Sequence, residues 1–168
     1  MRILVLAAVL GACGADKPSG PTATGSLVFD PQPASTVDAF LAGEGEVIRS
    51  ALLRRRLEEY ERVTLDADAI AVNRRPGTLI IDVTVADKDP QRAAHLCNGL
   101  LRTYLDYGRM RALSAIQLEQ QAVASELERR PNDDHVAVRM QQLDIVRTTA
   151  RTDVRVLDGC TVATASRR

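Results

Sequence analysis

The sequence is poor in aromatic residues: its 168 residues include three tyrosines, two phenylalanines and no tryptophan. So few rings offer little platform for stacking nucleic-acid bases. There is also no excess of positive charge, since lysine plus arginine number 22 and aspartate plus glutamate number 22. We therefore expect no nucleic-acid partner. Hydrophobic residues still make up 45% of the chain, enough for the core of one domain built from leucine, valine, isoleucine and alanine.

Near the N-terminus, the apolar run at residues 3–10 is only about half as long as the roughly 20 residues that a membrane-spanning helix needs. Arg2 precedes this run. A positive residue, a short apolar segment and a small-residue cleavage site are typical of a secretory signal. Leu10-Gly11-Ala12-Cys13 also resembles a lipobox, in which the cysteine is acylated and becomes the first mature residue. We predict a signal peptide at residues 1–12 and lipidation of Cys13; the alternative is a buried strand or helix that ends in cysteine.

Residues 14–25 are rich in small and polar types and have no hydrophobic period, so we predict a flexible tether at 13–25. The mature chain would begin with Cys13-Gly14, with no aspartate directly after the lipidated cysteine. In many Gram-negative bacteria this favours the outer membrane over the inner. We therefore expect the chain on the periplasmic face of a cell membrane, bound to the lipid bilayer through acylated Cys13.

Three short apolar runs predict strands: residues 26–30, 70–72 and 79–85. Pro76-Gly77 separates the last two runs and indicates a hairpin turn. Apolar residues at helical spacing predict a helix from Val37, with a kink or break at Gly43 and Gly45. Ser50 is the predicted N-cap of a second helical segment.

A long helix is predicted from Pro90, because Asp89 is a favourable N-cap and proline suits the first helical position. Its apolar stripe continues almost to Arg130, where Pro131-Asn132 breaks it. A shorter apolar stripe follows and predicts a return helix. A final strand is predicted at residues 153–158.

The lengths of these helices predict how they are arranged. About 40 residues of helix extend roughly 60 Å, whereas a return helix of about 18 residues covers roughly 27 Å. The return helix reaches the last strand only if residues 90–107 lie across the sheet and the remainder projects from near Gly108. The predicted fold is α+β: a split β-α-β-β-α-β (ferredoxin-like) base with a projecting αα-hairpin before the last strand. The domain would span residues 26–160, followed by a tail at 161–168.

Four segments of the predicted domain resemble those of a known family, in the same order: Glu46-Val47-Ile48-Arg49-Ser50 on a helix, Gly77-Thr78-Leu79-Ile80-Ile81-Asp82-Val83-Thr84-Val85 as a central strand, Asp87-Lys88-Asp89-Pro90 with Ala93-Ala94 and Asn98 at the start of the long helix, and Val154-Arg155-Val156-Leu157-Asp158 as the closing strand. The family is that of the Wzz-type polysaccharide co-polymerases, the chain-length determinants, through their periplasmic domain. Its members usually carry a transmembrane helix at each end and a longer hairpin, which this sequence does not show.

Members of that family act without catalysis, as rings that set how far an inner-membrane polymerase extends a glycan. The resemblance implies a scaffold or assembly factor in chain-length control or export of surface polysaccharide or exopolysaccharide. Its partners would be further copies of the chain and polysaccharide export or polymerase proteins. The alternative is a glycan- or envelope-binding lipoprotein that keeps the fold without a chain-length role.

Motifs for catalysis are absent from the sequence. It has no G-x-x-x-x-G-K-[ST] loop and no G-x-S-x-G elbow. Its two histidines, His95 and His135, do not have the spacing of a metal site. Acid pairs such as Glu58-Glu59 are more typical of solvated helix faces than of glycosidase carboxylates. We expect no enzyme, no cofactor and no metal, and leave an unrecognised hydrolase site as a third alternative.

Two further groups of residues leave alternatives open. Arg54-Arg55-Arg56 can bind an anionic ligand, because guanidinium groups suit carboxylate and phosphate; the alternative is a solvated face with Glu58 and Glu59 as i,i+4 partners. Cys97 and Cys160 can form a disulfide in an oxidising periplasm. The helix that carries Cys97 would lie about 10 Å above the sheet, however, which is beyond disulfide reach without a local dip.

Overall fold

The computed structural model describes residues 20–30, 37–149 and 154–162. The predicted signal peptide, Cys13 and most of the predicted tether and tail lie outside these residues. The fold is α+β and its elements follow in this order: β1 (Thr22–Phe29), α1 (Val37–Arg49), α2 (Ala51–Glu61), a 3₁₀ turn (Ala67–Ala69), β2 (Ile70–Arg74), β3 (Ile80–Ala86), α3 (Pro90–Arg129), α4 (Asp134–Thr149) and β4 (Val154–Val162).

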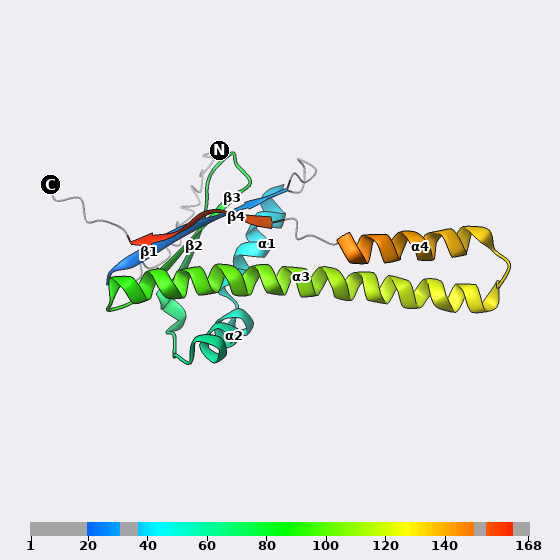
Figure 1. The fold of residues 1–168 in the computed structure, drawn as a ribbon. Helices are drawn as coiled ribbons and strands as arrows, with labels where there is room; N and C mark the ends of the chain where they lie inside the picture. The colour runs from blue at the N-terminus through cyan, green and yellow to red at the C-terminus, as the bar shows by residue number, and fades with distance from the viewer. Residues whose placement is uncertain (1–19, 31–36, 150–153, 163–168) are drawn as a thin grey trace, which may run out of the picture.

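The four strands form one sheet in the order β2-β3-β1-β4, and every neighbouring pair is antiparallel. The helices α1, α2 and α3 lie on one face of this sheet (Figure 1). Leu27 at the centre of β1 pairs with Ile81 of β3 and with Val156 of β4. Alternate side chains of β1 and β3 point toward the helices and are fully or almost fully buried: Ala23, Leu27, Phe29, Ile81, Val83 and Val85.

The predicted hairpin is confirmed as strands β2 and β3. Ile70 pairs with Val85 and Val72 with Val83, which places one apolar face of the hairpin on the core. The turn between the strands contains Gly77 at φ +70°, a left-handed backbone conformation that glycine adopts without steric cost. The Pro76-Gly77 pair in the sequence therefore predicted the position of the turn correctly.

The predicted break in the first helix is wrong, because α1 runs through both glycines without interruption. Gly45 is buried, and a Cβ there would lie 3.5 Å from the side chain of Val72. Packing of Leu41 and Ile48 into the core outweighs the roughly 1 kcal/mol by which each glycine weakens a helix. The predicted cap is confirmed: Ser50 Oγ accepts the N–H of Leu53 at the start of α2.

Two predicted boundaries are corrected by the strands. Strand β1 begins at Thr22, so the last four residues of the predicted tether belong to the sheet. Strand β4 ends at Val162, two residues into the predicted tail. The segment Thr22–Gly25 has no hydrophobic run for a sequence pattern to detect. It forms a strand because β3 pairs with it on one side and β4 on the other.

The long helix α3 is confirmed, with Asp89 Oδ1 accepting the N–H of Gln91 at its start. Its first half crosses the sheet, and its buried side chains there end at Tyr104. Beyond Gly108, α3 and α4 extend together past the sheet (Figure 1), and we call residues 108–149 the arm. The arm has a small core of its own, made of Leu127 and Met140 with three buried residues: Val123, Val136 and Leu143. Within the described residues, no helix is both long and apolar enough to span a bilayer.

Candidate functional site

The arm joins the sheet at a buried carboxylate. Glu44 lies on the core-facing side of α1 and is 6% exposed. Its Oε2 accepts the hydroxyl proton of Tyr104 at 2.6 Å, and its Oε1 accepts an N–H of Arg111 at 2.8 Å. We call these three residues the root cluster. Tyr104 precedes Gly108, where α3 leaves the sheet, and Arg111 follows it. The root cluster therefore joins α1 to α3 on both sides of this point, so side chains as well as the helix itself set the direction of the arm.

The environment of the root cluster favours one charge arrangement. Burial, the hydrogen bond to Glu44 and the charge of Glu44 raise the pKa of Tyr104 well above its usual range, so this phenol stays protonated as a donor. The hydrogen bond to Glu44 also raises the pKa of Arg111, which stays cationic. A buried carboxylate is unfavourable by several kcal/mol unless it is paired, and both of its oxygens are paired here.

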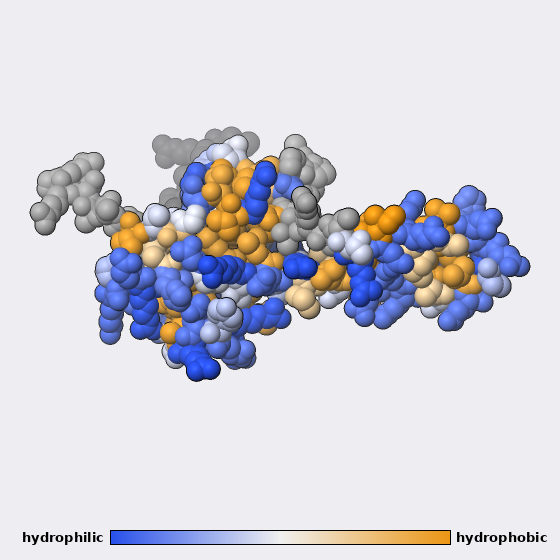
Figure 2. Space-filling view, viewed as in Figure 1, coloured by the Kyte–Doolittle hydropathy of each residue, from blue (hydrophilic) through white to orange (hydrophobic). Residues whose placement is uncertain are grey.

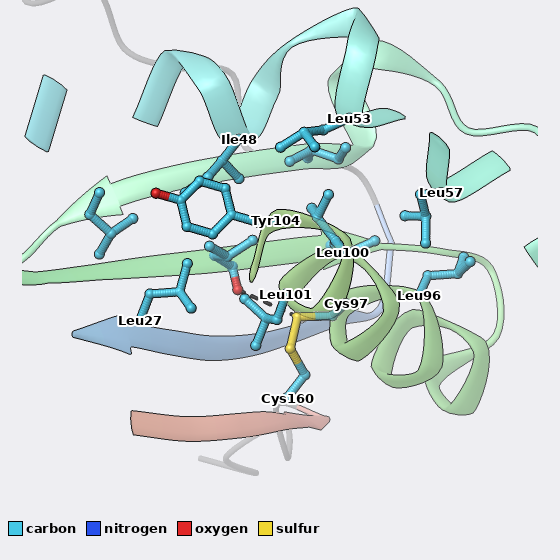
Figure 3. Close-up of a cluster of buried hydrophobic side chains, with 14 of the residues drawn as sticks. Leu27, Ile48, Leu53, Leu57, Leu96, Cys97, Leu100, Leu101, Tyr104 and Cys160 are labelled. Carbon is cyan, nitrogen blue, oxygen red and sulfur yellow. Dashed lines mark hydrogen bonds between the residues drawn. A yellow bond between two sulfur atoms is a disulfide. The ribbon is translucent and has the colours of Figure 1, made fainter. Parts of the chain in front are cut away.

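Aromatic rings surround the root cluster. The ring of Phe29 packs edge-on against Tyr104, with centroids 6.3 Å apart, and against Phe40 at 5.6 Å. Figure 3 shows Tyr104 among the buried leucines between α3 and the sheet. One turn further along α3, the guanidinium groups of Arg56 and Arg111 lie 5.6 Å and 6.0 Å from the ring centre of Tyr107. The root cluster therefore packs against aromatic rings, and Arg56 adds a second cation beside Tyr107.

The three predicted arginines differ in their surroundings. Consecutive helical residues point about 100° apart, and only Arg56 is directed at Tyr107. The alternative, a solvated face with i,i+4 pairs, is wrong for one pair, because Glu58 does not pair with Arg54. Its Oε1 accepts the N–H of Leu65 at 2.8 Å, beyond the end of α2. Arg55 and Arg56 are exposed, and Arg54 is half-buried.

A disulfide joins Cys97 of α3 to Cys160 of β4, with the two Cα atoms 5.8 Å apart (Figure 3). Both cysteines are buried, at 0% and 7% exposed. The predicted obstacle was the distance between a helix and its sheet. Two features remove it, an absent side chain on β1 and a distorted β4.

Gly25 of β1 makes room for the sulfur. A Cβ at this position would lie 2.6 Å from Cys160 Sγ and 3.0 Å from the main-chain oxygen of Asp158. The register of β4 against β1 also shifts twice, between Thr24 and Ser26 and again between Ser26 and Leu27. Such bulges bend a strand and redirect its side chains. The result is the local dip that a bond between helix and sheet requires.

Asn98, the residue after Cys97, is hydrogen-bonded to the main chain of Cys160, the disulfide partner of Cys97. Its Oδ1 accepts the N–H of Cys160 at 3.0 Å, and its Nδ2 donates to the carbonyl oxygen of Cys160 at 3.2 Å. We call Gly25, Cys97, Asn98 and Cys160 the latch. It ties β4, which follows the arm in the chain, to the half of α3 that precedes the arm.

The sheet face opposite the helices carries a polar cluster. Arg75 donates to both carboxylate oxygens of Asp82 at 2.9 to 3.1 Å and to Ser26 Oγ at 3.0 Å. Ser26 Oγ in turn donates to Asp82 Oδ1 at 2.7 Å. Burial acts to raise the pKa of Asp82, but the hydrogen bonds from Arg75 and Ser26 and the charge of Arg75 outweigh it and lower that pKa. Arg75 is thus held in place over β1 and β3.

A cleft of about 430 Å³ lies between the start of α1 and the β2–β3 turn. Its lining combines apolar, basic and other polar groups: Val37, Asp38, Leu41, Arg74, Arg75, Gly77, Thr78 and Leu79. Arg74 donates to the main-chain oxygen of Asp38 at 2.9 Å and pairs with its carboxylate at 3.1 Å. Each guanidinium group of the cleft is therefore held by an aspartate, Arg74 by Asp38 and Arg75 by Asp82.

Both histidines have hydrogen-bond partners within the fold. His95 Nε2 lies 2.6 Å from Glu61 Oε2 at the surface, and Asp133 Oδ1 accepts the N–H of His135 at the start of α4. Among the residues that the structure describes, no three metal-ligating side chains gather into a site. Every buried side-chain nitrogen and oxygen in the same part of the chain has a hydrogen-bond partner.

Sequence reasoning missed the root cluster, although a signal was present. Glu44 falls three residues after Leu41 and four before Ile48, so it lies in the apolar stripe of α1. An acid in such a stripe needs a buried partner. Tyr104 and Arg111 are seven residues apart and so share one face of α3.

No protein-family model matches this sequence, and no curated protein matches it.

Proposed function

We propose that this chain is a non-catalytic lipoprotein that acts as a scaffold in chain-length control or export of a surface polysaccharide or exopolysaccharide. The observation that carries the proposal is the arm, which projects from a sheet and is fastened at both ends. The root cluster holds α3 where the arm begins, and the latch holds β4 after the arm ends. A rigid projection from a membrane-bound base suits assembly better than it suits catalysis.

The arrangement of the sheet supports the resemblance to the Wzz-type domain. The order β2-β3-β1-β4 with antiparallel neighbours is the order expected for a split β-α-β-β-α-β, ferredoxin-like base. In that arrangement α1 and α2 connect the first two strands, and α3 with α4 connects the last two. In this proposal the inserted αα-hairpin is the counterpart of the longer hairpin that members of the family carry.

The arm is proposed to pack against further copies of the chain. Large apolar side chains on both of its helices are exposed: Met110 at 56%, Leu118 at 67% and Val138 at 51%. Figure 2 shows apolar side chains at the surface of α4 and along the seam between the arm helices. Two helices with a core of five side chains are marginal alone, and neighbouring arms would cover the remaining apolar surface.

The test is complementation of a deletion strain of the encoding bacterium, with glycan length resolved on gels. The unchanged chain is expected to restore the length distribution, whereas Leu118→Glu, which places a charge on the arm surface, is expected not to. Gln117→Glu adds the same charge to the neighbouring exposed position and is the matched control. Sedimentation of the full chain in detergent is expected to show oligomers that Leu118→Glu dissociates. An unaltered glycan in the deletion strain contradicts the proposal.

The cleft beside α1 favours a second candidate, a glycan-binding lipoprotein without a chain-length role. Arg74, Arg75 and the hydroxyl of Thr78 line it together with Asp38 and apolar side chains, and the two guanidinium groups suit the carboxylate of an acidic sugar. Titration with an acidic oligosaccharide tests this candidate, with Arg74→Ala expected to weaken binding and Arg49→Ala, an exposed arginine outside the cleft, expected to leave it unchanged. Binding in solution combined with unaltered glycan length favours this candidate over the scaffold.

A further inference from the structure

Strand β4 buries very little of its side-chain surface. Only Val154 at its start and Cys160 near its end are buried, at 8% and 7% exposed. The five residues between them are all exposed. Val156, which pairs with the buried Leu27, is 39% exposed, and Leu157 next to it is 48% exposed. The strand therefore gains little from the hydrophobic effect, in contrast to β1 and β3.

The pairing of β4 is also less regular than that of β3 on the other side of β1. It lies at the edge of the sheet and pairs only with β1. Two bulges interrupt this pairing around Ser26, whereas β1 and β3 pair without interruption from Thr22 to Val28. Bulges leave residues out of the hydrogen-bonded ladder. Attachment of β4 to the rest of the fold thus depends strongly on the latch.

We propose that β4 stays paired with β1 only while Cys97 and Cys160 are joined in the disulfide of the latch. When the disulfide is reduced, β4 leaves the sheet while β1, β2, β3 and the first half of α3 remain folded. The arm is then held by α3 and the root cluster alone, and the free edge of β1 is uncovered. The chain completes its fold only in a compartment that oxidises thiols. This inference does not depend on the proposed role in polysaccharide export.

The chemistry balances as a thiol–disulfide exchange. On closing, the two thiols lose two protons and two electrons, and the electrons reduce a disulfide of a small-molecule or protein oxidant to two thiols. On opening, a dithiol reductant such as dithiothreitol is oxidised to its cyclic disulfide while Cys97 and Cys160 become thiols. Removal of Cys97 and Cys160 reproduces the open state without a reductant.

The test is hydrogen exchange, followed by mass spectrometry, on the full chain in detergent. In the oxidised protein, the amides of β4 that are hydrogen-bonded to β1 are expected to exchange slowly, as those of β3 do. In Cys97→Ala/Cys160→Ala, the amides of residues 154–162 are expected to exchange roughly 100-fold faster than those of β3. The protein treated with dithiothreitol is expected to match the variant, with two alkylated thiols confirming reduction.

A matched control separates release of β4 from general loss of stability. Tyr104→Phe weakens the root cluster without touching β4, so it is expected to speed exchange in β3 and β4 equally. If the cysteine variant also speeds both strands equally, the disulfide stabilises the whole fold and the inference is overturned. Unchanged exchange in β4 of the variant overturns it as well. Asn98→Ala, which removes both hydrogen bonds to Cys160, is expected to speed β4 exchange by a smaller factor than the cysteine variant.

Discussion

Replacing Gly25 by alanine tests how closely β1 and the disulfide are packed. The added Cβ would lie 2.6 Å from Cys160 Sγ, closer than real Cβ atoms approach, and 3.0 Å from both the Asp158 oxygen and Leu101 Cδ1. Neither the sulfur nor the Asp158 oxygen can move freely, because the sulfur belongs to a disulfide and the oxygen to the main chain. Overpacking of this kind destabilises proteins by about 1 to 3 kcal/mol.

We expect Gly25→Ala to lower the free energy of unfolding by about 2 to 3 kcal/mol. For a chain of this size, that corresponds to a fall in Tm of roughly 5 to 10 °C. In the background Cys97→Ala/Cys160→Ala the closest contact is gone, so the same substitution should be milder, with a penalty of about 1 kcal/mol. The measurement is urea denaturation of the four proteins of this double-mutant cycle, which isolates the coupling between Gly25 and the disulfide.

Gly43→Ala is the matched control, because a Cβ at Gly43 would meet no atom within 4 Å. There the methyl group only improves helix propensity, and we expect a gain of about 1 kcal/mol. The reasoning is refuted if Gly25→Ala destabilises equally with and without the disulfide. It is also refuted if Gly25→Ala is as well tolerated as Gly43→Ala.

Three further predictions concern the root cluster, the open sheet face and the anchor. Tyr104→Phe removes the hydrogen bond to the buried Glu44 and is expected to lower the free energy of unfolding by about 1 to 2 kcal/mol in denaturant titrations, since the carboxylate keeps its second partner. The folded state lowers the pKa of Asp82 below its usual 3.8, so the stability from this carboxylate is present above that pH and is lost as the pH falls below it. Stability of the unchanged protein, measured by denaturation at a series of pH values, should therefore approach that of Asp82→Asn in acid. Labelled palmitate is expected to enter the unchanged chain but not Cys13→Ala in growing cells; equal labelling would exclude Cys13 as the anchor.

Much of the fold could be predicted because its signals are local. Asp89-Pro90 fixed the start of α3, Ser50 the start of α2, and Pro76-Gly77 the hairpin. Each depends on a few residues that satisfy helix ends or turns by themselves. The length of α3 followed from an apolar stripe that only Pro131 interrupts.

The rest depended on residues far apart in the chain. The path of α1 through Gly43 and Gly45 is set by packing on β2 and the core rather than by helix propensity. The strand at Thr22–Gly25 is set by its neighbours on both sides. The approach of Cys97 to Cys160 required a missing Cβ on a third element, which spacing in the sequence cannot report.

The uninterrupted course of α3 has a mechanical consequence. Its 40 residues form one rod without a joint, and the 22 or so beyond Gly108 extend roughly 33 Å. A tilt of about 5° where this rod lies on the sheet would displace its far end by about 3 Å. Force applied at the tip is likewise passed to the strands as torque, which the bonds of Glu44 and Cys160 resist together with the buried side of α3. The molecule is built as a lever.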